Sequence, residues 1–286
     1  MLRSSTIQLL RFHFSFFLMP VYWFALSQVV QIQAAHAILA FIILHFLIYP
    51  ASNGYNSYMD RDTESIGGIK SPQQPTRQLY YVTIILDITG LLLSLLISRY
   101  FSMGILAFIL ASRAYSYRGI RLKKYPVLGY LTVLIFQGAL VFFIIKHGCS
   151  ITKTLQVPPV AMLAASLLVG GFYPLTQIYQ HEADKADGVR TLSLLLGYKG
   201  TFVFTAIVYL LALLALAVYF ASNLELDRFF LIQILMSPVL VYFFWWFYQV
   251  HKNTSAANYK NTMRMNILAS ACTNAAFITL FIIEKY

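Results

Sequence analysis

Residues 49–64 read YPASNGYNSYMDRDTE, a stretch that places three carboxylates and two asparagines directly after a long apolar run. Residues 173–187 read YPLTQIYQHEADKAD and repeat its first part as Tyr-Pro-x-x-(Asn/Gln)-x-Tyr-(Asn/Gln)-x-x-x-Asp. We call these two stretches acidic segment 1 and acidic segment 2. Ionisable groups at the end of an apolar helix are costly, so function is their default interpretation. The repeat predicts two halves of one polar site in a membrane protein.

The composition places the chain in the membrane class. Of the 286 residues, 59% are hydrophobic and only 11% are charged, whereas soluble domains carry about 25% charged residues. A membrane-spanning helix needs roughly 20 apolar residues. Such runs lie near 12–31, 35–56, 79–99, 101–117, 126–146, 158–181, 200–221, 229–250 and 265–283. We therefore expect one all-α domain over residues 1–286, with nine transmembrane helices and two pseudo-repeated four-helix units.

The basic residues predict the orientation. On this arrangement the 21 lysines and arginines gather on the side that carries both acidic segments, except for Arg99, Lys146, Lys153, Arg228 and Lys285. Because cytoplasmic loops carry the excess of Lys and Arg, the N-terminus and the acidic segments are predicted to be cytoplasmic. The net charge of +11 then needs no nucleic-acid partner. Cys149 and Cys272 show no pairing or His-cluster pattern, so neither a disulfide framework nor a zinc site is indicated.

Helical spacing selects candidate metal ligands. Asn56, Asp60 and Glu64 recur every fourth residue, which keeps them within about 80° of one another on a helix, with Asp62 nearly opposite. In acidic segment 2 the side chains that share a face are Gln177, Gln180, Asp184 and Asp187. Carboxylate and amide oxygens suit Mg²⁺ held by one or two carboxylates, with water and substrate phosphate completing its shell. The alternative interpretation is a pair of ordinary solvated helix ends.

Basic residues next to these acids indicate that the ligand is a diphosphate. Lys70 and Arg77 follow acidic segment 1, Arg190 follows acidic segment 2, and Lys123 lies in the run AYSYRGIRLKKYP at 114–126. Arg and Lys bind phosphate oxygens directly. Neither a P-loop nor a GxGxxG motif occurs, so a nucleotide on a soluble α/β fold is not indicated.

The motifs resemble those of the UbiA superfamily of intramembrane prenyltransferases. Its Asn-x-x-x-Asp-x-x-x-Asp motif is matched by Asn56, Asp60 and Glu64, and its second motif by Gln180, Asp184, Gly188, Thr191 and Leu192. The family's Tyr-Ser and Arg-Leu-Lys after helix four are also present, at residues 115–116 and 121–123. Two positions depart from the family, Glu64 and Gln180, where Asp is usual. Asp187 is a candidate to compensate for Gln180.

The resemblance implies a nine-helix bundle around a central cavity. It also implies transfer of an isoprenyl group from a polyprenyl diphosphate to a hydrophobic or aromatic acceptor of the quinone-precursor kind, which is a transfer of an alkyl group other than methyl. Mg²⁺ is the implied cofactor, the lipid bilayer is the expected surrounding, and no obligate protein partner is indicated. Asp60 and Asp184 are the candidate catalytic residues. We assign the substrate cavity to Asn53, Tyr55, Tyr115, Tyr173 and Gln177.

Three other functions remain open. A terpene cyclase on the same fold would use the same metal without an acceptor. An ion-coupled transporter would place its acids near the bilayer midplane between inverted repeats, whereas both acidic segments fall on one predicted face at helix ends. A catalytically silent binding protein is favoured only by Gln180.

Overall fold

The computed structural model describes residues 1–285, which are helical apart from their connecting loops and contain no strand. The first half comprises α1 (Ser4–Leu10), η1 (Phe12–Phe17), α2 (Met19–Ser27), α3 (Ala34–Ile42), η2 (Ile43–Ile48), α4 (Tyr49–Asp60), α5 (Arg77–Ser94), α6 (Arg99–Ser116), η3 (Leu122–Lys124), α7 (Pro126–Val133), η4 (Leu134–Leu140) and α8 (Val141–Cys149). The second half comprises α9 (Pro159–Gln177), η5 (Ile178–Gln180), α10 (His181–Ala186), α11 (Leu192–Ser222), α12 (Leu226–Lys252), η6 (Thr254–Ala256) and α13 (Tyr259–Lys285).

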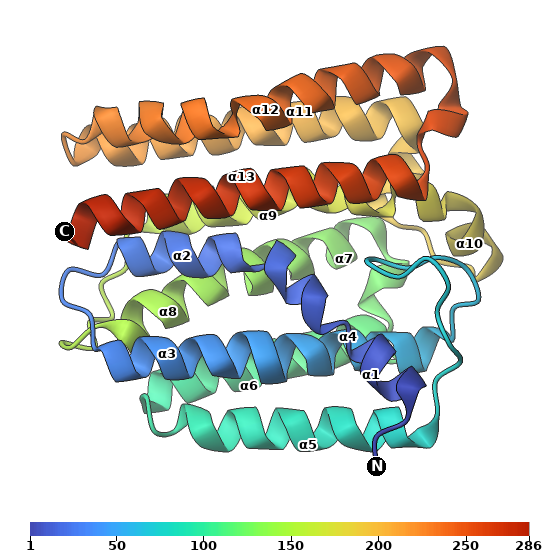
Figure 1. Ribbon diagram of the computed structural model, residues 1–286, viewed down its shortest axis with the longest axis horizontal. Helices are drawn as coiled ribbons and strands as arrows, with labels where there is room; N and C mark the ends of the chain where they lie inside the picture. The colour runs from blue at the N-terminus through green and yellow to red at the C-terminus, as the bar shows by residue number, and fades with distance from the viewer. Residues whose placement is uncertain (286) are drawn as a thin grey trace.

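The long helices lie side by side and run along the longest dimension of the molecule (Figure 1). Six continuous helical segments are long and apolar enough to cross a bilayer: Ala34–Asp60, Pro126–Cys149, Pro159–Ala186, Leu192–Ser222, Leu226–Lys252 and Tyr259–Lys285. A seventh span results if Ser4–Phe17 and Met19–Ser27, bent by 41°, count as one. The all-helical membrane class is confirmed, and the count of nine spans stays a prediction.

Buried and outward surfaces are both apolar. A single large cluster of buried side chains includes residues of α2, α8, α9, α11, α12 and α13. Phe24, Phe142 and Phe277 are almost fully buried within it. Large hydrophobic side chains also cover the outside, where Ile234 and Val241 are more than two-thirds exposed. An apolar exterior over long helices is what lipid contact requires.

Both acidic segments lie at the same end of the bundle, where Figure 1 shows α10 and the loop after α4. The C-terminus of the described chain lies at the opposite end. Three of the basic residues that the sequence places at this opposite end form polar contacts there. Lys146 donates to the carbonyl of Gln28 at 2.6 Å, Lys285 donates to the carbonyl of Val29, and Arg228 pairs with Glu284 at 3.0 Å. Lysines near helix C-termini stabilise the free carbonyls there.

Two π-helical segments interrupt the spans. η2 ends at Ile48, two residues before Pro50, whose missing N–H disturbs the regular ladder. η4 lies in the middle of the span Pro126–Cys149 and packs against α9 at Gly138. A Cβ at Gly138 would come within 2.4 Å of the Ser166 Cα, so only glycine permits this close approach.

Candidate functional site

Acidic segment 1 turns inward at the end of α4. Arg61 adopts the left-handed conformation with φ 55° and ends the helix at Asp60. Asn56 and Asp60 face a cavity from the last turns of α4, and Asp62 returns to the same cavity from the loop. Glu64 is exposed and lies outside the cavity. The predicted stripe through Glu64 is therefore wrong, because the helix stops before it and the turn brings in Asp62 instead.

Acidic segment 2 also changes its helical form within the motif. α9 ends at Gln177, a 3-10 turn carries Gln180, and α10 carries Asp184. These three side chains line the cavity. The hydroxyl of Thr191 donates to Asp184 at 3.1 Å and caps α11 by accepting from the Leu194 N–H at 3.2 Å. Asp184 is thereby fixed to the start of the next long helix.

Asp187 does not share that face. It follows α10, is exposed, lies outside the cavity, and accepts a hydrogen bond from Arg121. Arg118 approaches its carboxylate at 4.0 Å. α10 ends at Ala186, so Asp187 follows the helix and lies outside the cavity. Its role as a metal ligand and as a substitute for Gln180 stays a prediction. Asp187 instead joins α10 to the loop that follows α6.

The cavity holds about 1150 Å³ of empty space, part of it open to solvent. Its polar end takes side chains from α4, the loop after it, η3, η5 and α10. Its inner wall comes from α6, η4 and α9. Asn56 donates to the Ser116 hydroxyl at 3.0 Å, and the hydroxyls of Ser52 and Ser112 lie 2.6 Å apart, so hydrogen bonds join α4 to α6 behind the acids.

Three basic side chains lie near the carboxylates of the site, those of Arg11, Arg121 and Lys123. Only Lys123 was predicted from the sequence as a diphosphate ligand. Lys123 donates to Asp60, whose side chain is only 6% exposed, and Arg121 approaches the other oxygen of Asp60 at 3.6 Å. Arg11 lines the same cavity from the loop between α1 and η1, held by the carbonyls of Asn53 at 3.2 Å and Gly67 at 3.4 Å. The sequence gives no signal for Arg11 beyond a basic residue before an apolar run.

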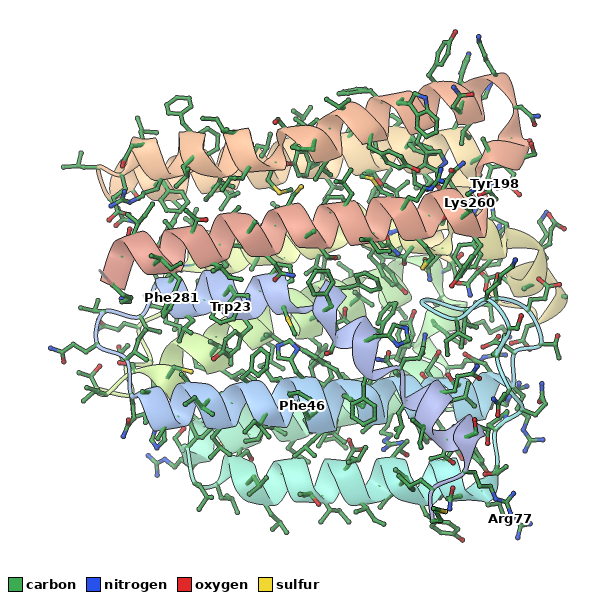
Figure 2. All side chains as sticks on the ribbon, viewed as in Figure 1. Trp23, Phe46, Arg77, Tyr198, Lys260 and Phe281 are labelled. Atoms are coloured by element: carbon green, nitrogen blue, oxygen red, sulfur yellow. The ribbon has the colours of Figure 1, made fainter. Side chains whose placement is uncertain are left out.

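The other predicted diphosphate ligands lie outside the cavity. The side chains of Lys70, Arg77 and Arg190 are exposed and do not line it. Figure 2 shows Arg77 at the edge of the molecule near the start of α5, away from α10. Arg190 contributes only its backbone N–H, which donates to the Lys124 carbonyl at 3.4 Å. Adjacency in sequence to the acids therefore does not bring these side chains into the cavity, and their role as diphosphate ligands stays a prediction.

The tyrosines divide between the cavity and the outer packing. The hydroxyls of Tyr115 and Tyr173 are hydrogen-bonded to each other on the cavity wall, and Gln177 donates to Tyr173 at 3.0 Å. Asn53 lines the cavity as predicted. Tyr55 does not: its ring lies under the Arg113 guanidinium at 3.9 Å, where Arg113 also pairs with Asp87. Tyr55 therefore stabilises the packing of α4 on α5 and α6.

The donor set fits a hard divalent ion that brings further ligands with it. Within residues 1–285 no three His, Cys, Asp or Glu side chains converge closely enough to enclose an ion alone. Asp60 and Gln177, which line the cavity, each nevertheless have one buried side-chain oxygen without a hydrogen-bond partner. Burial, with the Asp60 charge adding to it, raises the pKa of Asp62 to about 6, so at neutral pH it is largely ionised. Mg²⁺ commonly takes one or two carboxylates and completes its octahedron with water and phosphate oxygens.

Comparison with known families decides the identity. The model of the UbiA prenyltransferase family matches residues 16–268. The chain belongs to the UbiA prenyltransferase family. A comparison with curated protein sequences gave no match.

Solved structures of UbiA homologues share the fold at low identity. A UbiA homologue from Archaeoglobus fulgidus bound to DMAPP and Mg²⁺ has a TM-score of 0.72 and 17% identity, covering 98% of this chain and 100% of that one. The same homologue bound to GPP and Mg²⁺ gives 0.71 and 18% with the same coverage. An apo UbiA homologue from Aeropyrum pernix K1 gives 0.68 and 18%, covering 94% of this chain and 98% of that one.

Proposed function

We propose that this UbiA family member transfers a prenyl group from an isoprenyl diphosphate to a hydrophobic acceptor within the membrane, with Mg²⁺ as cofactor. The observation that carries the proposal is the convergence of both acidic segments with Arg11 and Lys123 at the polar end of one cavity. The A. fulgidus homologue, which shares the fold, is bound to prenyl diphosphates together with Mg²⁺.

A second cavity supplies the place for a hydrocarbon chain. It holds about 1000 Å³, is lined mainly by apolar side chains of η1, α2, α9 and α13, and shares Phe14 and Tyr173 with the polar cavity. An allylic diphosphate needs such a site, with its charged head among the acids and cations and its apolar tail in a continuous hydrophobic space. The shared wall is then where C1 of the prenyl group lies.

The polar residues of the cavity have two proposed roles, metal binding and diphosphate binding. Asp60, Asp62 and Asp184, with the amides of Asn56 and Gln180, would hold Mg²⁺. When bound, Mg²⁺ stabilises the negative charge that develops on the departing diphosphate. Arg11 and Lys123 bind diphosphate oxygens directly, because both side chains line the wall of the polar cavity.

The reaction breaks the allylic C–O bond, and its electron pair stays on the diphosphate oxygen. The acceptor's electron pair forms the new bond to C1, and the proton that the acceptor loses passes to the released diphosphate. Tyr115, Tyr173 and Phe136 line the polar cavity and would offer aromatic surface to the cationic carbon. They also keep water from it, since a buried apolar wall excludes competing hydrolysis.

The proposed topology has nine spans with the acidic segments in the cytoplasm. α5 and α6, of 18 residues each, would reach about 27 Å, close to the 30 Å hydrocarbon core. The gathering of Lys and Arg at the end that carries both acidic segments supports the cytoplasmic placement. An aromatic acceptor of the quinone-precursor kind is part of the same proposal.

The test is turnover by the purified protein in lipid nanodiscs. We expect Mg²⁺-dependent release of diphosphate from geranyl diphosphate and a prenylated acceptor detected by mass spectrometry. Asp60→Asn and Asp184→Asn should each lower kcat by at least about a hundredfold, the scale for loss of a group that stabilises developing charge. Asp227→Asn, at the opposite end and 71% exposed, is the matched control and should keep full activity. Full activity in either site variant, or turnover without a divalent ion, would refute the proposal.

A further inference from the structure

Polar side chains form a collar where the two cavities meet. Gln137 of η4 and Asn266 of α13 line both cavities, and Ser270, one turn further along α13, lines the apolar one. Building on the proposed function, we infer that this collar binds the oxygen atoms of the prenyl acceptor, and that the acceptor is an uncharged ring carrying hydroxyl or keto groups. We call Gln137, Asn266 and Ser270 the amide collar.

The amide collar has unused hydrogen-bonding capacity. Its neighbours Ser166, Thr176 and Thr273 donate their hydroxyls to backbone carbonyls at 2.6–3.1 Å. The side chains of Gln137, Asn266 and Ser270 form no hydrogen bond with any other residue in the range 1–285, although Asn266 and Ser270 are each only 7% exposed. A polar group held in an apolar cavity without a partner costs free energy. A ligand with oxygen atoms would remove that cost, whereas a hydrocarbon chain would not.

The backbone conformation of η4 determines the position of Gln137. η4 is π-helical over seven residues, a local widening that is frequent at functional sites. The Ser166 hydroxyl donates to the Leu134 carbonyl at 3.1 Å, which satisfies an acceptor at the start of η4. Gly138 allows η4 to lie directly against α9. The deviation from α-helical geometry therefore directs Gln137 to the boundary between the cavities.

The charges around the collar define the class of acceptor. No Asp, Glu, Lys, Arg or His of the described chain lines the apolar cavity. Of the two cations of the polar cavity, Lys123 pairs with Asp60 and Arg11 donates to the carbonyls of Asn53 and Gly67. A carboxylated or phosphorylated acceptor placed at the collar would lose its hydration without a counter-charge. The rings of Phe14, Phe136 and Phe172 around it favour a flat ring instead.

Two acceptors that differ by one carboxylate group test the inference. The protein in nanodiscs is supplied with Mg²⁺, geranyl diphosphate and either 1,4-dihydroxynaphthalene or 1,4-dihydroxy-2-naphthoate. We expect the uncharged ring to be prenylated with at least a tenfold higher kcat/KM. Gln137→Met and Asn266→Leu should each raise the KM for 1,4-dihydroxynaphthalene about tenfold, the loss of one hydrogen bond in a cavity. The KM for geranyl diphosphate should stay within twofold.

Controls separate a local effect from a folding defect. Gln233→Leu on α12 replaces an amide that lines neither cavity and should leave both KM values unchanged. Ser270→Ala is a mild second variant and should raise only the KM for the uncharged acceptor, by a few-fold. Mg²⁺-dependent binding of geranyl diphosphate, measured by calorimetry, should match the wild-type protein in every collar variant.

Several results would overturn the inference. It fails if the wild-type protein prenylates only the carboxylated ring, or neither ring, or if the collar variants leave the acceptor KM unchanged. It also fails if the variants alter only the release of geraniol, because the collar would then hold a water molecule. Absence of both Mg²⁺-dependent geranyl diphosphate binding and diphosphate release would instead refute the proposed function itself.

Discussion

Asp187 offers the sharpest contrast between the sequence pattern and the structure. The pattern makes it a metal ligand, whereas the structure pairs it with Arg121, whose side chain is 11% exposed against 39% for Asp187. Asp187→Asn removes one partner of Arg121 and leaves Asp60 at 3.6 Å as the other. Breaking a buried pair costs about 3–5 kcal/mol and an exposed pair about 0–1 kcal/mol. For a half-exposed pair with a remaining partner, we expect a loss of about 1 kcal/mol.

The measurement combines stability with metal dependence. A loss of about 1 kcal/mol lowers Tm by roughly 2 °C in a chain of this length. Asp187→Asn should show that shift and keep the Mg²⁺ concentration for half-maximal turnover within twofold of the wild-type value. Asp184→Asn should do the reverse, with little change in Tm and a large increase in the Mg²⁺ requirement. If Asp187→Asn raised the Mg²⁺ requirement as much as Asp184→Asn, Asp187 would be a ligand and the ion-pair argument would be wrong.

Three further outcomes follow from the geometry. Asp62→Asn should raise the Mg²⁺ needed for half-maximal turnover about tenfold, while Glu64→Gln, outside the cavity, should leave the titration unchanged. Gly138→Ala should destabilise the protein by about 1–3 kcal/mol in thermal melting, because its Cβ would meet the Ser166 backbone, whereas Gly171→Ala, with no contact under 3.6 Å, should not destabilise it. Chelation by EDTA should abolish turnover and added Mg²⁺ should restore it; turnover that persists in EDTA would contradict the metal assignment.

Hydrophobic runs and the repeated motif were enough to predict the helical membrane class and the position of the site. The repeat predicted that Asn56, Asp60 and Asp184 meet, and the structure places all three on one cavity. These residues lie within helices or directly at their ends, where periodicity predicts position well. The prediction used only local pattern and one assumption, that two similar helix ends share one face.

The errors begin where a helix ends. The phase argument extended α4 to Glu64, but Arg61 in the left-handed conformation reverses the chain direction after Asp60. Asp62, predicted to point away, therefore enters the cavity. In acidic segment 2, α10 similarly ends at Ala186, directly before Asp187, which lies outside the cavity. Helical spacing carries no information about the residue at which the helix stops.

The cations were harder to predict because they come from distant parts of the chain. Arg11 reaches the cavity from the first helical turns, and its contacts to Asn53 and Gly67 span more than 40 residues of sequence. Lys70 and Arg190 adjoin the acidic segments in sequence yet face outward. A positive-inside excess makes basic residues common on this side of the bundle, so adjacency alone selects poorly among them.

The paired charges indicate how the donor enters the site. Carboxylates and cations alternate around the cavity mouth, where Asp60, Asp62, Asp184 and Asp187 lie close to Arg11, Arg118, Arg121 and Lys123. A diphosphate alone would therefore meet cations that are already shared with carboxylates. Together with Mg²⁺ it brings positive charge for those same carboxylates. Gln180 adds no further negative charge to this group, so on the proposed function we expect the donor to enter with its metal rather than before it.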